Sequence, residues 1–397
     1  MSKIFFFCIP AWGHTNPTIP VVEELVKRGH QVRYYSFSMF RKKIESTGAE
    51  FVCCDPYLPD LTDEEMDGMK NVSPVQMTLT DIDITIRMDP MLSKDVETEK
   101  PDCIVADSVC FWGKLIARKY GIPFVSSTTT FAFNRYSSRY IKNSFRDLLE
   151  LLLGMPKMKK AFAKLEPLGY HVENFMSIIQ NDNDTNTIVY ASKKFQPCAD
   201  TFSEHYAFVG PSVKLPETVA LPERRKRIYI SMGTVLENNE KFYQNCVEAL
   251  KDLDAEIIIS AGKNTDLSGF GTLPENVSVY PSVNQLEVLS QTDVFLTHCG
   301  MNSVSESLYL GVPMVLYPRT GEQKAVAQRA FEVGAGEYLK SEKPEVIREA
   351  VMRVLSDGTY KASAEQMRAD FAACSHESGA ADFIEKVIKA GKSQEIV

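Results

Sequence analysis

Short apolar runs alternate with helix-length amphipathic segments along both halves of the chain. In the first half "KIFFFCIP" is followed by "TIPVVEELVKRGH" and "QVRYYSF", and in the second half "RIYISMG" is followed by "EKFYQNCVEALKDL" and "AEIIISAG". This alternation is typical of parallel strands joined by crossover helices. It predicts an α/β protein with a doubly wound, Rossmann-like sheet in each half.

The length and one proline-rich stretch divide the chain into two parts. A chain of 397 residues exceeds what one hydrophobic core normally supports, so two domains are expected. Residues 209–227, "VGPSVKLPETVALPERRKR", hold three prolines without a sustained period, which is typical of a linker. We therefore expect a first domain over residues 1–208 and a second over residues 228–397, with the last helix able to pack back on the first.

The net charge and the cysteines indicate which partners and which cellular compartment to expect. A net charge of -8 disfavours nucleic acid or an anionic membrane as the main partner, because both would repel the chain at long range. Nine cysteines form an odd set without a CxxC pair, which fits a reducing cytoplasm. The first apolar run is broken by Pro10, and no stretch reaches the length of a membrane span. We expect a cytoplasmic protein without stable membrane insertion.

The stretch "THCGMNSVSESLYLGVP", residues 297–313, carries the strongest chemical signal. A strand runs into a tight turn, and a helix begins near Asn302 and ends at Gly311. The amino end of such a helix favours a phosphate, to which His298 and the Ser303 hydroxyl can donate. Glu306, one turn further on the same face, can accept from ribose hydroxyls. Taken singly, Ser303 could instead be a helix cap and Glu306 an exposed carboxylate.

Residues 293–336, "DVFLTHCGMNSVSESLYLGVPMVLYPRTGEQKAVAQRAFEVGAG", resemble the donor-sugar signature of a known enzyme family. The family is that of nucleotide-sugar-dependent glycosyltransferases with the two-domain GT-B fold, in the bacterial macrolide and natural-product type of the UDP-glycosyltransferases. "GHTNPTIPVVEELVKRGHQVRYYS", "ISMGT" at 230–234 and "NQLEVLSQTDVFLTH" are similar to further family segments. The resemblance implies two Rossmann-like domains facing across a cleft. It also implies inverting transfer of a hexose, most often glucose, from a UDP-sugar.

The resemblance assigns donor-binding roles to residues of the second half. It implies that the diphosphate, the ribose, the base and the sugar are held by Ser231, Gly233, Thr234, Ser282, Val283, Gln285, His298, Gly300, Asn302, Ser303, Glu306, Glu322 and Gln323. Two positions depart from the family pattern. Ser282 stands where many relatives carry a tryptophan that stacks on uracil, and Cys299 stands where glycine is the commonest residue of the family. The first departure leaves the choice between UDP and dTDP donors open.

His14 follows the first expected strand, at the edge of the sheet where α/β proteins bind ligands. An imidazole is a suitable general base for removing a proton from an acceptor hydroxyl. Asp107 ends the strand "CIVAD" and could orient that base, and in the family resembled the corresponding residues form such a dyad. The alternatives are a loop histidine bonded to backbone and an aspartate that caps a helix. Asn16 is expected to be the N-cap of the helix that follows.

Metal-binding and acceptor-binding residues are less well marked. "DID" at 81–83 and "DND" at 182–184 match the DxD pattern of metal-dependent transferases, but neither follows a convincing strand, so we expect no metal and no cofactor beyond the donor. The resemblance implies a hydrophobic acceptor such as a macrolide or a flavonoid. Aromatic residues near the expected catalytic loops could bind it or belong to the core: Trp12, Phe111, Trp112, Phe131 and Phe133.

Three other functions remain compatible with a fold of this kind. A sugar-nucleotide epimerase or hydrolase would need no acceptor and would leave the aromatic residues unexplained. A lipid-intermediate transferase should show Gly-rich turns in the first domain, and "IPAWGHTNP" lacks them. A non-catalytic nucleotide-sugar-binding protein should have lost His14 or Asp107. The sequence leaves open whether the chain is a monomer or a homodimer.

Overall fold

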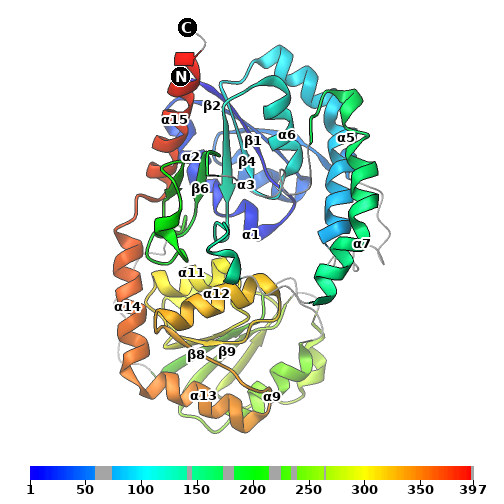
Figure 1. The fold of residues 1–397 in the computed structure, drawn as a ribbon. Helices are drawn as coiled ribbons and strands as arrows, with labels where there is room; N and C mark the ends of the chain where they lie inside the picture. Colours follow the sequence, from blue (N-terminus) through cyan, green and yellow to red (C-terminus); the bar gives the residue numbers. More distant parts are fainter. Residues whose placement is uncertain are drawn as a thin grey trace. The chain divides into compact units, whose positions relative to one another are not determined.

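The structure is a computed structural model that describes residues 1–58, 74–140, 145–172, 183–213, 225–233, 239–262 and 265–394. The chain divides into two compact units (Figure 1). Their bounds are Met1–Ser138, Asn143–Ser212 and Ser375–Val397 for unit 1, and Arg139–Lys142 and Val213–Cys374 for unit 2.

Unit 1 is built on a seven-stranded sheet with the order β3-β2-β1-β4-β5-β6-β7, and its neighbouring strands pair in parallel. Parallel strands are covered on both faces, which explains why β1 reads as the unbroken apolar run "KIFFF". The strands are β1 (Lys3–Phe7), β2 (Gln31–Ser36), β3 (Glu50–Cys53), β4 (Cys103–Asp107), β5 (Phe124–Thr128), β6 (Thr187–Val189) and β7 (Tyr206–Phe208).

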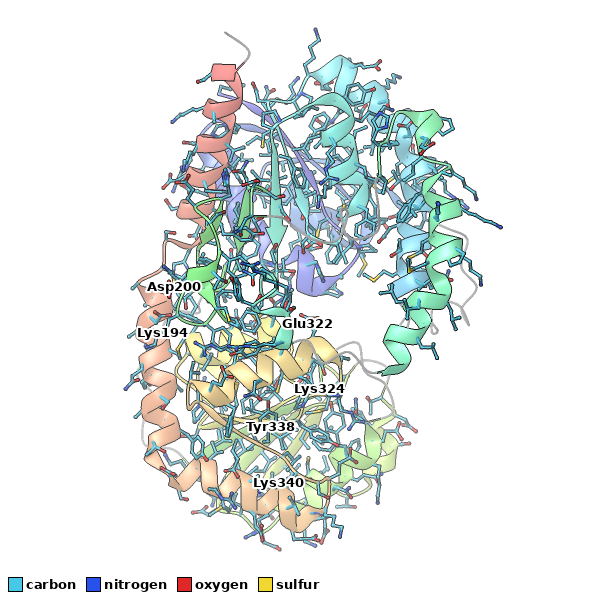
Figure 2. The ribbon with its side chains drawn as sticks, in the orientation of Figure 1. Lys194, Asp200, Glu322, Lys324, Tyr338 and Lys340 are labelled. Carbon is cyan, nitrogen blue, oxygen red and sulfur yellow. The ribbon has the colours of Figure 1, made fainter. Side chains whose placement is uncertain are left out.

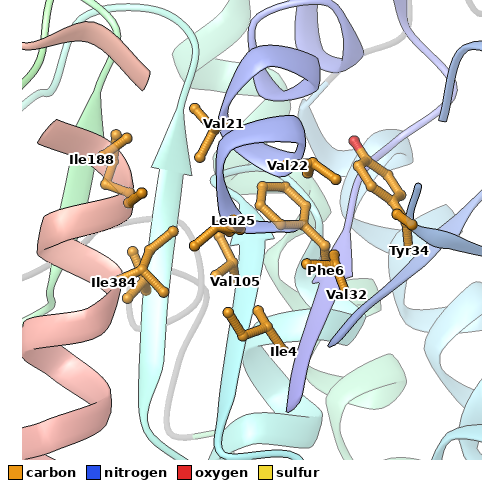
Figure 3. Packing of buried hydrophobic residues seen from close by; sticks show 14 of the residues in the cluster. Ile4, Phe6, Val21, Val22, Leu25, Val32, Tyr34, Val105, Ile188 and Ile384 are labelled. Carbon is orange, nitrogen blue, oxygen red and sulfur yellow. The ribbon is translucent and has the colours of Figure 1, made fainter. Parts of the chain in front are cut away.

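Helices cover both faces of this sheet, and each face has its own apolar cluster. The helices are α1 (Trp12–Thr15), α2 (Thr18–Lys27), α3 (Arg41–Glu45), α5 (Pro74–Glu99), α6 (Phe111–Tyr120), α7 (Phe145–Phe162) and α15 (His376–Gln394). Figure 3 shows one cluster, in which Ile384 of α15 lies among residues of β1, β4, β6 and α2. The last helix therefore belongs to the core of unit 1, although it follows unit 2 in the sequence.

Unit 2 contains a six-stranded parallel sheet with the order β10-β9-β8-β11-β12-β13. Its strands are β8 (Lys226–Ser231), β9 (Ala255–Ser260), β10 (Val277–Tyr280), β11 (Val294–Thr297), β12 (Met314–Leu316) and β13 (Gly336–Tyr338). Its helices are α9 (Glu240–Leu250), α10 (Gln285–Leu289), α11 (Met301–Tyr309), α12 (Gly321–Glu332), α13 (Pro344–Ser356) and α14 (Gly358–Ala372). The two sheets confirm the α/β prediction of a Rossmann-like sheet in each half.

Each sheet has a point at which the strand order reverses. In unit 1 the first strand, β1, lies between β2 and β4, and in unit 2 the first strand, β8, lies between β9 and β11. Crossover connections leave the sheet in opposite directions at such a point, which opens a crevice beyond the carboxyl ends of the two central strands. The segments that follow β1, β4, β8 and β11 are thereby brought to the two places in the fold best suited to bind a ligand.

One local prediction beside these strands is wrong. Asn16 is not an N-cap, because it and Pro17 already have helical backbone angles, and the Asn16 amide oxygen accepts a hydrogen bond from Lys43 Nζ at 2.7 Å. Asp81 and Asp83 of the "DID" sequence lie within α5. Of "DND", only residues 183 and 184 fall within the described part of the chain.

The amphipathic helix α7 packs on the rest of unit 1 with one side only. Helix α7 packs against α5 and buries Gly154 and Met158, whereas Leu149, Leu152 and Leu153 are exposed. No helix among the described residues is both long enough and apolar enough to cross a membrane.

Candidate functional site

His14 and Asp107 meet at the point of unit 1 where the strand order reverses. His14 lies in the one-turn helix α1 that follows β1, and Asp107 is the last residue of β4, the neighbouring strand. His14 Nδ1 and Asp107 Oδ2 are 2.8 Å apart, although 93 positions separate the two residues in the sequence. Parallel pairing accounts for the contact, since it places the carboxyl ends of both strands at one edge of the sheet.

The partners of His14 determine which ring nitrogen carries the hydrogen. An ionised carboxylate can only accept, so the Nδ1–H group donates to Asp107 and the lone pair of the neutral ring resides on Nε2. Thr129 Oγ1, just beyond β5, lies 3.2 Å from the same Nδ1. The His14 side chain is 27% exposed and the Asp107 side chain is 0% exposed. The ring can thus be reached from solvent while the carboxylate that orients it is sealed.

The surroundings of Asp107 hold its carboxyl group in place and keep two neighbouring groups neutral. Its second oxygen, Oδ1, accepts a hydrogen bond from the Val109 backbone N–H at 3.0 Å. Burial raises the pKa of the Cys8 thiol and of the Asp81 carboxyl, and the charge of Asp107 raises both pKa values further. Both of these neighbours of Asp107 are therefore held neutral.

Unit 2 has a tight backbone turn between β11 and α11, where unit 1 has the His14–Asp107 pair of side chains. Cys299 is fully buried and adopts a left-handed φ of 67°, and Gly300 is the extended N-cap of α11. The His298 ring fits against two glycines, because a Cβ on Gly233 or Gly300 would lie 2.6 or 2.7 Å from its Nε2. A left-handed φ favours glycine, which agrees with the glycine that the resemblance implies at this position.

His298 is held as a neutral imidazole. Burial lowers its pKa to about 4, against the opposing effect of a hydrogen bond with the Ser231 backbone. A neutral ring can donate one N–H to a phosphate oxygen without bringing a charge into the fold. Ser231 ends β8, which pairs with β11, so the two loops that we expect to bind phosphate start from adjacent strands.

Glu306 and Ser303 share one partner on the neighbouring helix α10. The Gln285 amide Nε2 donates to Glu306 Oε2 at 2.7 Å and to Ser303 Oγ at 3.3 Å. Gln285 is the first residue of α10, and Ser282 and Val283 lie shortly before it, the former exposed and the latter half-buried. The structure therefore brings the residues assigned to base, ribose and phosphate to one end of the unit 2 sheet.

The two residues assigned to the sugar lie in the first turn of α12. Glu322 is exposed (Figure 2). Gln323 forms a capping box with Thr320, and its amide oxygen accepts from the backbone N–H groups of Arg319 and Thr320 at 2.8 and 3.1 Å. Only the amide nitrogen of Gln323 is left to donate to a sugar hydroxyl. Thr234, also assigned to the donor, lies outside the described residues.

Three of the five aromatic residues offered as acceptor ligands belong to the core. Phe111, Trp112 and Phe131 are 3% or less exposed. Phe111 and Trp112 open α6, whose apolar face packs on the sheet, so these side chains present no surface to a ligand. Trp12 is 46% exposed beside His14, and Phe133 is half-buried, which leaves these two as the candidates.

Residues 244–385 match the family described as "Erythromycin biosynthesis protein CIII-like, C-terminal domain". "NDP-glycosyltransferase YjiC" of Bacillus licheniformis is 34% identical over 368 residues, which cover 90% of each chain. "Uncharacterized UDP-glucosyltransferase YojK" of Bacillus subtilis is 30% identical and covers 98% of each chain. The chain belongs to the bacterial natural-product UDP-glycosyltransferase family. The crystal structure of the kitacinnamycin glycosyltransferase superposes with a TM-score of 0.83 at 28% identity, covering 97% of this chain and 98% of that one, and this glycosyltransferase therefore has the GT-B fold.

Sequence reasoning missed two residues of this natural-product glycosyltransferase. Thr129 contacts the His14 ring, and its position just beyond β5 was the available signal. Tyr229 of β8 donates through its hydroxyl to Gln285 Oε1 at 3.3 Å, and a tyrosine in a buried strand gave no signal at all. In the part of the chain that the structure describes, no three His, Cys, Asp or Glu side chains gather as a metal site would require.

Proposed function

We propose that this glycosyltransferase moves glucose from UDP-glucose to a hydroxyl of a hydrophobic small molecule with inversion at the anomeric carbon. The observation that carries the proposal is the 2.8 Å contact between His14 Nδ1 and the fully buried carboxylate of Asp107. A buried carboxylate orients the ring and stabilises the imidazolium that forms when the ring takes a proton.

The chemical step needs a base on the acceptor side and a stabilised leaving group on the donor side. The acceptor O–H gives its proton to His14 Nε2, and its oxygen attacks the anomeric carbon as the bond to the UDP oxygen breaks. UDP leaves with the electron pair of that bond, so an α-linked donor yields a β-glycoside. Asp107 balances the charge on His14 until the proton is released to solvent.

The leaving diphosphate gains negative charge, and unit 2 offers neutral donors for it. The N–H groups at the amino end of α11, the neutral His298 ring and the Ser303 hydroxyl would stabilise that charge without a metal ion. Glu306 would accept from the ribose hydroxyls, and Glu322 with the Gln323 amide nitrogen would bind the sugar.

The acceptor side rests on Trp12 and Phe133. The Trp12 ring packs edge-on against Phe40 with 4.8 Å between ring centroids, which leaves part of its surface exposed close to His14. A flat or apolar aglycone would bury this surface, and the description of the matching family favours macrolide-like natural products.

The first experiment measures UDP release from UDP-glucose with a panel of flavonoid, macrolide and steroid alcohols. Control reactions omit the acceptor, parallel reactions contain EDTA, and the masses of the products are measured by mass spectrometry. We expect acceptor-dependent release with a hexose mass gain that EDTA does not reduce. Release without any acceptor would indicate a hydrolase or an epimerase instead, and loss of activity in EDTA would refute the metal-independent step.

A further inference from the structure

The side chain of Tyr229 connects the buried sheet of unit 2 to the donor-binding helices. Tyr229 lies in the middle of β8 and is 1% exposed. Its ring stacks on Phe295 of the neighbouring strand, with 4.8 Å between centroids and 12° between planes. The ring is thus fixed by packing, and its hydroxyl has a defined position from which to act on Gln285.

The hydroxyl determines how the Gln285 amide is oriented. Tyr229 Oη donates to Gln285 Oε1 at 3.3 Å, while the amide nitrogen of Gln285 donates to Glu306 Oε2 at 2.7 Å. If the amide were turned over, its oxygen would face the Glu306 carboxylate, and two acceptors would repel each other at that distance. The donor on Tyr229 and the acceptor on Glu306 therefore favour the same orientation.

The tyrosine hydroxyl keeps its proton in this environment. Burial is the main reason that the pKa of Tyr229 rises to about 12, and the negative charge of Glu306 contributes in the same direction against hydrogen bonds with Ser231 and Ser260. The hydroxyl is consequently available as a donor throughout the neutral pH range.

We propose that Tyr229 is a positioning residue that acts through the Gln285 amide to hold Glu306 in the orientation that reads the 2′-hydroxyl of the donor nucleotide. The site would thereby select ribonucleoside diphosphates over their 2′-deoxy counterparts. This inference rests on the proposed donor site of unit 2 and adds the means by which its carboxylate is aimed. A site whose buried polar groups are arranged around a hydroxyl rejects the analogue that lacks it, because those groups are then left unpaired.

The test compares the dissociation constants of UDP and 2′-deoxy-UDP by titration calorimetry, in the whole protein without a sugar donor. The wild type should bind UDP at least about tenfold more tightly, as expected for a hydrogen bond to a charged acceptor. Tyr229→Phe keeps the ring and its stacking and removes only the hydroxyl. It should weaken UDP binding about threefold to tenfold and leave 2′-deoxy-UDP almost unchanged, since the 3.3 Å contact is long for a hydroxyl donor.

Three further variants test whether the effect of Tyr229→Phe acts through Gln285 and Glu306. Glu306→Gln should abolish the preference for UDP. Gln285→Met has a similar length without an amide, and it should act like Glu306→Gln even if Tyr229→Phe folds poorly. Tyr338→Phe is the matched control, because Tyr338 of β13 (Figure 2) donates through its hydroxyl to Gln328 Oε1 of α12 at 3.4 Å in the same unit. It should keep the wild-type preference.

The outcomes separate the inference from the function on which it rests. If Glu306→Gln loses the preference and both Tyr229→Phe and Gln285→Met retain it, the proposed positioning role of Tyr229 is wrong, whereas the ribose contact of Glu306 remains supported. If Tyr229→Phe weakens both nucleotides equally, Tyr229 has only a structural role. If the wild type binds both nucleotides equally, or Glu306→Gln changes nothing, the ribose assignment itself fails.

Discussion

The two sheets use the same edge of the same kind of fold in different ways. At the end of β1 and β4, unit 1 aligns two side chains, His14 and the buried Asp107. At the end of β8 and β11, unit 2 forms a backbone turn in which Gly233 and Gly300 leave room for a neutral His298. A base needs a partner that orients it, whereas a phosphate site needs close approach to backbone N–H groups. We therefore expect changes in unit 1 to affect turnover and changes in unit 2 to affect binding or stability.

Replacing His14 tests the unit 1 half of this comparison with the largest expected effect. His14→Ala removes the proposed base, and the rate of transfer should fall by about 10²- to 10⁴-fold because the acceptor proton no longer has an oriented acceptor. The dissociation constant of UDP, measured by calorimetry, should remain within about twofold of wild type. Near-normal turnover would remove His14 from the mechanism.

A smaller loss is expected when the base stays and its orienting partner changes. Asp107→Asn keeps the size of the side chain, but its amide can present a donor to His14 Nδ1 and favour the wrong tautomer. Turnover should fall by about 10- to 10³-fold, less than in His14→Ala, with UDP affinity unchanged. A fall in UDP affinity that matched the fall in rate would contradict the separation of roles between the units.

In unit 2, the buried His298 should reveal itself through the pH dependence of stability. Its pKa is about 4 in the folded chain and about 6.5 when exposed, so the unfolded state takes up the proton first as the pH falls. Stability should therefore drop between pH 7 and pH 5, by about 2 kcal/mol from this group alone. The free energy of unfolding of His298→Asn should therefore decrease less than that of the wild type over the same pH range.

The measurement is urea unfolding of both proteins at the two pH values. The change in the free energy of unfolding between the two pH values is compared between wild type and variant. This comparison cancels the contribution of all other titrating groups that do not contact the ring. Equal pH dependence in wild type and variant would show that the ring is not held neutral.

The smallest effect is expected at Cys299. Its left-handed φ of 67° is strained for a residue with a Cβ, and Cys299→Gly would relieve that strain while losing a buried thiol. The two contributions are similar, so the free energy of unfolding should change by about 1 kcal/mol or less, and UDP affinity should not change. A tenfold loss of UDP affinity in this variant would mean that the side chain itself contributes to the site.

Local patterns were enough to predict the elements that carry the unit 2 site. The Gly-Pro signals bounded α11 closely, since the helix runs from Met301 to Tyr309 and the chain turns at Gly311. The same reasoning left the aromatic residues open between core and acceptor binding, because an apolar side chain looks alike in a core and in a binding surface. It also missed that the Gln323 amide oxygen caps its own helix.

The sequence by itself determined the alternation of strands and helices, the two-part division and the turn before α11, because each depends on residues close together in the chain. Only the tertiary structure decided that Asp107 meets His14 across 93 positions and that Phe111 and Trp112 are core. It also decided that Thr129 belongs to the site of unit 1 and Tyr229 to the site of unit 2. These facts depend on strand order, since two residues far apart in the chain become neighbours only where parallel pairing brings the ends of their strands to one edge.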